Sequence, residues 1–217
     1  MSTRLVLASA SPARLSTLRS AGVDPLVIVS DVDEDAALHR AEQVHGPLPG
    51  ADVALTLARA KCEAVAAGLP PADLVLGCDS VLELDGSIHG KPRDAAEATT
   101  RWRAMRGRSG VLHTGHWLTD LRDPDAGGSG GTVGGTASTT VHFAELSDTE
   151  IEAYVATGEP LQVAGAFTVD GLGGPYVTAI EGDFHTVVGL SLPLLRDLLG
   201  QLGLLFHELR DHGVGRG

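Results

Sequence analysis

Cysteine is scarce in this chain, which has only Cys62 and Cys78 among its 217 residues. Two cysteines cannot form the disulfide framework of a small secreted domain, and we interpret both as small, buried apolar residues. Long apolar runs are missing as well, so the sequence offers no signal-peptide core and no membrane span. We therefore expect a cytoplasmic protein that does not associate with membranes.

Basic residues are also few: 16 lysines and arginines face 28 aspartates and glutamates, and the net charge is -12 at pH 7. This balance excludes a general basic face of the kind that binds nucleic-acid polymers. An acidic protein that binds phosphates must place its cations locally, and Arg14, Lys61 and Lys91 are the candidates. With 43% apolar and 20% charged residues, the composition is that of a globular protein.

The beginning of the chain predicts a strand, a turn and a helix that together can bind an anion. Residues 5–8 are apolar, Ser11 suits a helix N-cap, and Pro12 suits the first helical position. The free N–H groups and the positive end of the helix dipole would then face a phosphate, with Arg14 adding a forked contact. The alternative interpretation is an ordinary strand and helix joined by a good cap.

This segment resembles the start of the Maf family of nucleoside-triphosphate pyrophosphatases, which is named for inhibition of septum formation. The family opens on a Ser-x-Ser-Pro-x-Arg motif, which is matched by Ser9, Ser11, Pro12 and Arg14. Further family motifs follow in the same order: Leu57-Ala58-Arg59-Ala60-Lys61, Gly77-Cys78-Asp79-Ser80, Gly90-Lys91-Pro92, and Gly158-Glu159-Pro160 followed by Ala164-Gly165-Ala166-Phe167. The resemblance extends from Arg4 to about Leu195.

The resemblance implies an α/β fold in which helices flank a mixed, twisted sheet, with two lobes around a central cleft as in inosine triphosphatases. It implies one domain over residues 1–217, and a homodimer by analogy alone. The implied reaction is hydrolysis of a nucleoside triphosphate to the monophosphate and diphosphate, which would clear modified nucleotides. The alternative function is a non-catalytic, nucleotide-binding regulator of cell division.

Between these motifs the sequence pattern gives coarse expectations for the remaining elements. Gly, Pro, Asp and Ser punctuate the chain, and apolar residues recur with helical or strand periodicity. The expected elements are a helix over 53–67 capped by Asp52, a strand over 74–84, a hairpin turn at Asp85-Gly86, a flexible glycine-rich loop near 123–136, strands over 163–177 and 177–190, and a tail from about 205.

Asp79 is the candidate general base. It follows the apolar stretch 75–78, so burial can raise its pKa and let it take a proton from water. In the alternative interpretation it is a strand-end aspartate that accepts hydrogen bonds from backbone N–H groups. The resemblance favours catalysis, because Asp79 aligns with the general base of the family.

Two lysines are candidates for binding the phosphate chain. An ammonium group is a compact charge that can neutralise phosphate oxygens and the charge that develops on departing diphosphate. Taken alone, Lys61 and Lys91 could equally be solvated surface charges. Because both coincide with lysines of the family motifs, the resemblance assigns them to substrate binding, together with Ser9, Ser11 and Arg14.

The acidic run over residues 31–35 has two interpretations. It is either a solvated turn or part of a site for a divalent cation, since Mg²⁺ binds through one or two carboxylates together with phosphate oxygens. The resemblance implies that Asp33 and Glu34, with Asp79, hold Mg²⁺ or Mn²⁺. Zinc is not expected at His113 and His116, because residues three apart on a strand face opposite sides.

The positions that select the base depart from the family pattern. The pyrimidine-specific branch has Arg, Thr and Gln where this chain has Ala13, Ser80 and Asp170, and a second branch has Trp at the first of these positions. Ala13 can neither hydrogen-bond nor stack on a base, and an ionised Asp170 only accepts hydrogen bonds. The reaction therefore carries over from the resemblance, whereas the preferred base does not.

Overall fold

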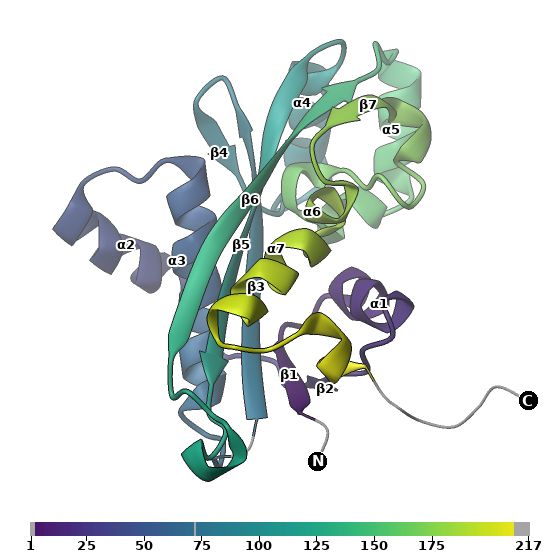
Figure 1. Cartoon of the computed structure of the whole chain (residues 1–217). Coiled ribbons are helices and arrows are strands. Elements are labelled where there is room, and N and C mark those ends of the chain that lie inside the picture. Colours follow the sequence, from purple (N-terminus) through teal and green to yellow (C-terminus); the bar gives the residue numbers. More distant parts are fainter. Residues whose placement is uncertain (1–2, 72, 211–217) are drawn as a thin grey trace, which may run out of the picture.

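Seven strands form one mixed sheet in the computed structural model, which describes residues 3–71 and 73–210 (Figure 1). The strand order is β2-β1-β3-β5-β6-β7, and β4 also pairs with β3. The strands are β1 (Arg4–Ala8), β2 (Leu26–Val27), β3 (Asp73–Leu84), β4 (Ser87–His89), β5 (Ser109–Asp120), β6 (Thr132–Phe143) and β7 (Val177–Glu181). The α-helices are α1 (Pro12–Ser20), α2 (Glu34–His45), α3 (Gly50–Ala66), α4 (Ala95–Met105), α5 (Asp148–Ala156), α6 (Phe184–Val188) and α7 (Leu192–Gln201).

The N-terminal strand, turn and helix form as the sequence predicts. β1 is buried, the Ser11 side chain caps α1 by accepting a hydrogen bond from the Arg14 N–H, and Pro12 is the first helical residue. Gly22 follows the helix with φ +86°, a backbone conformation that glycine adopts without steric cost. The helix therefore presents its N-terminus at the end of β1.

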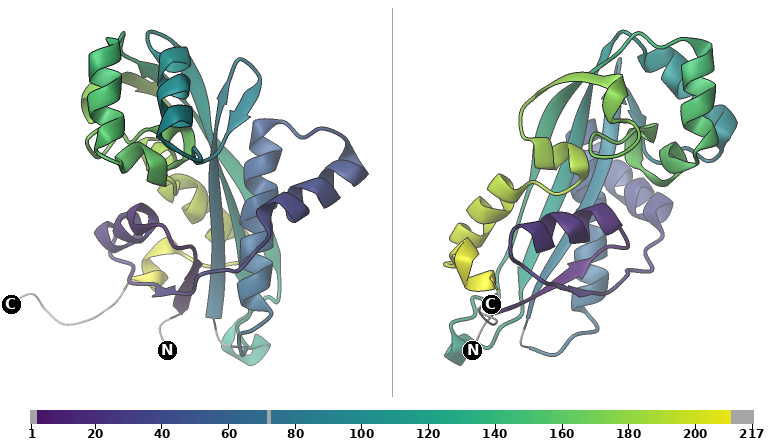
Figure 2. Two further views of the ribbon diagram at one scale, coloured as in Figure 1. Left: turned by 180° about the vertical axis from the view of Figure 1, so that it is seen from behind. Right: turned by 90° about the vertical axis from the view of Figure 1, so that its right-hand side faces the viewer.

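Helices cover both faces of the sheet (Figure 2). Side chains alternate along β3: Leu76 and Cys78 belong to a core cluster with residues of α1 and α7, whereas Val75 packs with residues of α3. The same alternation sends Asp79 and Ser80 to opposite faces. The two neighbouring positions of one family motif consequently contact different helices.

Two glycines let α3 lie directly on the sheet. A Cβ atom at Gly77 of β3 would be 2.1 Å from the Ala58 carbonyl oxygen, and one at Gly115 of β5 would be 2.3 Å from that of Ala54. No side chain fits at either position without moving the helix. This close approach places Lys61, one turn after Ala58, beside β3.

Aromatic residues fill a second core around α4 and α5. The Trp102 ring makes edge contacts with Phe143, Tyr154 and Tyr176, and its Nε1 donates a hydrogen bond to the Ala166 carbonyl at 2.8 Å. This cluster and the one around α1 and α7 form the two lobes that the resemblance implies. The expected α/β fold with a mixed sheet is confirmed.

The glycine-rich segment differs from the flexible loop expected near 123–136. β6 begins at Thr132, so Gly134 and Gly135 belong to a strand. Gly134 pairs with Trp117 of β5, and a Cβ atom on it would be 2.2 Å from the indole ring. Gly134 makes room for a cross-strand tryptophan, and only the preceding part of the segment connects β5 to β6 through a short 3₁₀ turn.

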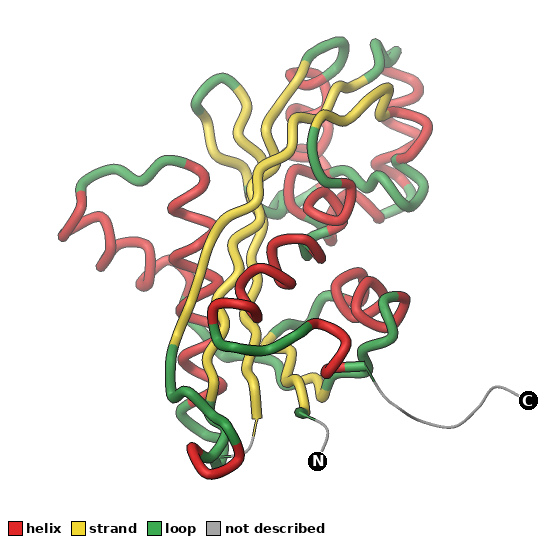
Figure 3. The backbone as a smooth tube through the Cα atoms, in the orientation of Figure 1, coloured by secondary structure: helices red, strands yellow, loops and turns green. Residues whose placement is uncertain are grey.

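The strands expected over 163–177 and 177–190 are wrong in most of their length (Figure 3). The chain there forms 3₁₀ turns, then β7, then α6, which Asp183 caps by accepting hydrogen bonds from the N–H groups of His185 and Thr186. Near the C-terminus, the tail expected from about residue 205 begins with a 3₁₀ turn over Phe206–Leu209. Residues 211–217 lie outside the described residues.

Two further expectations on the helices need correction. α3 begins at Gly50 after Pro49 rather than at a cap formed by Asp52, because the chain turns into the helix where Pro49 already has extended backbone angles. The acidic run leads into α2, which the sequence pattern did not predict. Among the described residues, no helix combines the length and apolarity needed to cross a membrane.

Candidate active site

Asp79 lies in a stretch of β3 that has one open edge. β1 pairs with β3 as far as Ala8 opposite Gly77, and β4 joins the same edge only where Leu82 lies opposite His89. β5 pairs along the other edge throughout. The residues between the two pairings can therefore be approached from the side.

The chain connections diverge at the same place. β1 lies between its parallel neighbours β2 and β3, and the connection to β2 runs through α1 on one face of the sheet. The connection from β2 to β3 runs through α2 and α3 on the other face. Open α/β sheets bind ligands outside the carboxyl end of such a strand, where the connections diverge. The first family motif begins at this point, with Ser9.

On the α3 face, two carboxylates share one ammonium group. Lys61 Nζ donates a hydrogen bond to Asp79 Oδ1 and lies 2.8 Å from Glu34 Oε1. The side chains of Lys61 and Asp79 are only 14% and 12% exposed. A buried carboxylate with a fixed ammonium beside it is the arrangement expected for a base that acts next to anionic oxygens.

Burial raises the pKa of Asp79 above its usual range, although the positive charges of Lys61 and Arg14 act in the opposite direction. Burial alone would lower the pKa of Lys61, but Asp79 and Glu34 outweigh it and the pKa is raised. Lys61 is therefore charged at neutral pH. In the part of the chain that the structure describes, the Asp79 carboxylate accepts its hydrogen bond from the Lys61 side chain rather than from a backbone N–H group.

On the opposite face, Arg14 links three segments of the chain. Its guanidinium donates to the Ser9 hydroxyl at 2.9 Å, to the Ser80 hydroxyl at 3.1 Å and to the Gly189 carbonyl at 2.7 Å. Arg14 is 9% exposed, so it is part of the protein interior. Ser9 also accepts a hydrogen bond from the backbone N–H of Ser11, which fixes the turn into α1.

A layer of polar residues that the sequence analysis missed supports this face. Thr114 shares a hydrogen bond with Ser80 and donates to the Thr186 carbonyl at 2.9 Å. His116 Nε2 accepts a hydrogen bond from the Ser191 N–H at 2.9 Å, and burial lowers the pKa of this histidine to about 4. In the sequence, Thr114 and His116 of the His-Thr-Gly-His stretch could have indicated this polar layer.

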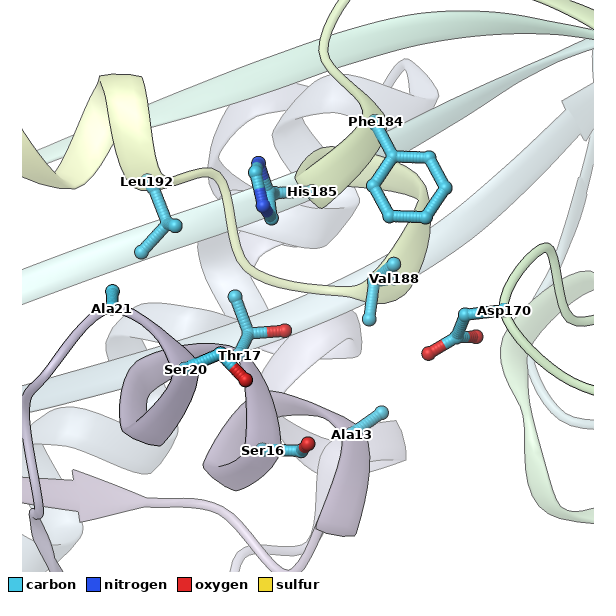
Figure 4. Close-up of a pocket in the computed structure, with 10 residues that line it drawn as sticks. All are labelled: Ala13, Ser16, Thr17, Ser20, Ala21, Asp170, Phe184, His185, Val188 and Leu192. Carbon is cyan, nitrogen blue, oxygen red and sulfur yellow. The ribbon is translucent and has the colours of Figure 1, made fainter.

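A cleft of about 250 Å³ opens between α1, the segment that carries Asp170, and α6 (Figure 4). Ala13 and Asp170 both line it, so two of the three residues expected to select the base face one cavity. Phe184 and Val188 add an apolar wall, and the Phe184 side chain is 42% exposed. Ser80 does not line the cleft, and its hydroxyl accepts a hydrogen bond from Arg14.

The Gly-Glu-Pro motif organises the loop before this cleft. Glu159 accepts hydrogen bonds from the hydroxyls of Tyr154 and Thr168 and from the backbone N–H groups of Leu172 and Gly173. Burial opposes ionisation of Glu159, but these hydrogen bonds outweigh it and lower its pKa. A charged Glu159 thus fixes both sides of the turn that contains Asp170.

Lys91, the third candidate cation, lies in the loop after β4. It is exposed and forms no ion pair within residues 3–71 and 73–210. β4 runs antiparallel to β3, so the chain that follows it runs back along β3 in the direction of Asp79. The Gly90 carbonyl before Lys91 accepts hydrogen bonds from Arg101 at 2.6 Å and from the Gly165 N–H at 3.1 Å.

Comparison with known proteins identifies the family. The family model described as Maf-like protein matches residues 4–202. The chain belongs to the Maf family. It is 59% identical to a nucleoside triphosphate pyrophosphatase of Salinispora tropica, over 97% of this chain and 89% of that one. Proteins of the same name from Streptomyces coelicolor and Leifsonia xyli are 56% and 54% identical over 95% of this chain, and 94% and 96% of their own lengths are covered.

One solved structure also matches most of the chain. It is a nucleoside-triphosphatase / dITP/XTP pyrophosphatase from Mycobacterium abscessus, 14% identical, with 93% of this chain and 96% of that chain covered and a TM-score of 0.40.

Part of the expected metal-ligand set suits a divalent cation. Glu34 and Asp79 contact the same Lys61 ammonium, so their carboxylates are close enough to share one ion. Asp33 does not join them: its Oδ1 accepts a hydrogen bond from the Ala36 N–H at 2.9 Å and caps α2. In the part of the chain that the structure describes, no three His, Cys, Asp or Glu side chains surround one point. Substrate oxygens would have to complete the coordination.

Proposed function

We propose that this chain is a nucleoside triphosphate pyrophosphatase, which hydrolyses its substrate to a nucleoside monophosphate and diphosphate. The observation that carries the proposal is the pair of Asp79 and Lys61, nearly buried at the open edge of β3 beside the N-terminus of α1. Relatives more than half identical over nearly the whole chain bear this name. Because nucleoside triphosphates are the substrates, we place the activity in the cytoplasm.

In the reaction, the Asp79 carboxylate takes a proton from a water molecule. The water oxygen forms a bond to a phosphorus atom of the α–β linkage, and the bridging P–O bond breaks. The electron pair of that bond leaves with the departing group, and diphosphate is released. Lys61 stays protonated and stabilises the negative charge that grows on the phosphate oxygens. Its hydrogen bond to Asp79 also orients the base.

The remaining contacts divide between the phosphate chain and the metal. The N–H groups at the start of α1, with Ser9 and Ser11, bind phosphate oxygens, and Arg14 fixes this turn and supplies positive charge. Lys91 approaches from the loop after β4. Glu34 and Asp79 would hold Mg²⁺ or Mn²⁺, which when bound neutralises phosphate oxygens and orients them.

The cleft beside α1 takes the base. Asp170 accepts hydrogen bonds, so it favours a base edge with an amino group, and the small Ala13 leaves the opposite side of the cleft open. Phe184 offers an exposed aromatic face on which any base can stack. This pocket therefore favours bases that carry hydrogen-bond donors, and it has few contacts that would exclude either a purine or a pyrimidine ring. We propose a broad specificity, suited to clearing modified nucleotides.

Product analysis tests the reaction. Incubation with a panel of triphosphates and Mg²⁺ or Mn²⁺ should release diphosphate and the matching monophosphate, measured by ion-exchange chromatography. Release of orthophosphate and a nucleoside diphosphate would contradict the proposed bond cleavage. Tight nucleotide binding without turnover in any metal would instead favour the non-catalytic regulator of cell division.

A triple substitution tests the assignment of the base pocket. The native protein should turn over several triphosphates without an exclusive preference for dTTP and UTP. Replacing Ala13→Arg, Ser80→Thr and Asp170→Gln should shift the ratio of kcat/KM toward pyrimidines by about tenfold or more, since a matched hydrogen-bond partner discriminates strongly. The measurement is kcat/KM for the common and methylated triphosphates. An unchanged profile would place the base pocket elsewhere.

A further inference from the structure

We propose that Arg101 is a positioning residue, which acts by fixing the backbone from which Lys91 reaches the phosphate chain. The inference rests on the proposed function, because it takes Lys91 as a substrate ligand. Arg101 lies on α4, its side chain is 4% exposed, and it donates to the Gly90 carbonyl at 2.6 Å. A charged side chain is rarely buried to this degree unless it has partners.

The carbonyl that Arg101 binds is held from two sides. The Gly165 N–H donates to the same Gly90 oxygen at 3.1 Å. Gly165 belongs to a 3₁₀ turn with φ +73°, and Trp102 holds this turn through its hydrogen bond to the Ala166 carbonyl. Arg101 and Trp102 are consecutive residues of α4, and they fix two segments. Arg101 holds the backbone just before Lys91, and Trp102 holds the 3₁₀ turn whose Gly165 N–H binds the same Gly90 carbonyl.

Gly90 needs such support. A Cβ atom built on it would meet nothing within 4 Å, so packing does not restrict this glycine. Glycine also has the largest backbone freedom of any residue. With the hydrogen bond from the Gly165 N–H alone, Lys91 would sample more positions, and substrate binding would bear the entropic cost of ordering it. With the hydrogen bond from Arg101 as well, the exposed ammonium is carried on an ordered backbone.

The neighbouring arginine provides a matched control. Arg93 pairs with Glu97 at 2.7 Å, the same carboxylate that Arg101 contacts at 2.7 Å. The Arg93 side chain is 87% exposed and has no contact with the Gly90 carbonyl. Replacement of Arg93 removes a guanidinium from Glu97 and keeps the hydrogen bonds that Arg101 and the Gly165 N–H donate to the Gly90 carbonyl.

The experiment is a double-mutant cycle on kcat/KM for a nucleoside triphosphate with Mg²⁺. We expect Arg101→Met to lower kcat/KM about tenfold, because a displaced binding group loses much of its effect. Arg93→Met should stay within about twofold of the native value, as a surface ion pair contributes little. In a Lys91→Ala background, Arg101→Met should have almost no further effect, since the two residues act as one unit.

Two results would overturn the proposal. One is an equal loss from Arg101→Met with and without Lys91, which would mean a general structural role. The other is unchanged kinetics in Lys91→Ala while diphosphate is still released, which would remove Lys91 from the site and leave the proposed reaction standing. Arg101→Lys, which keeps a donor near Gly90, should recover part of kcat/KM and covers the case in which Arg101→Met unfolds. Urea unfolding of each variant reports on that case.

Discussion

Replacing Asp79 with asparagine should lower kcat by about three orders of magnitude, the loss typical of removing a general base. Asparagine keeps the shape of the side chain and can still contact Lys61, but its amide cannot accept a proton from water. The fold should be unchanged, because the open edge of β3 at this position carries no strand pairing that the substitution could break. The measurement is diphosphate release under saturating substrate, with circular dichroism as a check on folding.

The pH dependence of kcat/KM separates this role from a structural one. Burial raises the pKa of Asp79, so activity should fall with acidity at a pH above the ordinary titration of an aspartate. Lys61→Met removes a charge that lowers this pKa, and the acid limb should then move to still higher pH. Asp24→Asn, on an exposed residue paired with Arg19, is the control and should leave the profile unaltered. Near-native turnover in Asp79→Asn would eliminate Asp79 as the base.

Local sequence signals predict the parts of this site that depend on neighbours along the chain. The cap formed by Ser11 and Pro12 needs nothing beyond residues 9–14, and the apolar run before Asp79 is enough to predict a buried strand. The pairing of Asp79 with Lys61 is different. It depends on Gly77, which lets α3 lie against β3. The resemblance assigned both residues to one site but did not predict this contact.

Long-range partners account for what the sequence could not provide. From the sequence, Arg14 is expected to direct its whole guanidinium toward a phosphate. In the structure this group donates a hydrogen bond to the carbonyl of Gly189, 175 positions away. A backbone oxygen as partner cannot be recognised from the sequence. Gly134 likewise suggests a loop until its partner Trp117 on the next strand is known. A glycine in a sequence indicates either a neighbour that leaves no room for a Cβ atom or a backbone conformation that other residues disfavour. Only the tertiary structure distinguishes these two causes.

The buried His116 should make the stability of the protein depend on pH in a defined window. Its pKa in the folded protein is about 4, whereas an exposed histidine titrates near 6.5. Below pH 6.5 the unfolded chain therefore takes up a proton that the folded protein refuses until about pH 4. The contribution of His116 to the free energy of unfolding should be constant above the first value, fall between the two, and level off below the second.

His116→Gln tests this window, because glutamine can still accept the hydrogen bond from the Ser191 N–H and does not titrate. Between pH 7 and pH 5 the native protein should lose about 2 kcal/mol more unfolding free energy than the variant, measured by urea denaturation. His207→Gln, at an exposed position, should follow the native curve. If His116→Gln loses as much stability as the native protein, protonation of His116 does not limit folding in acid. A smaller loss in His116→Gln would mean that proton uptake by this histidine in the unfolded chain lowers the stability of the native protein in acid.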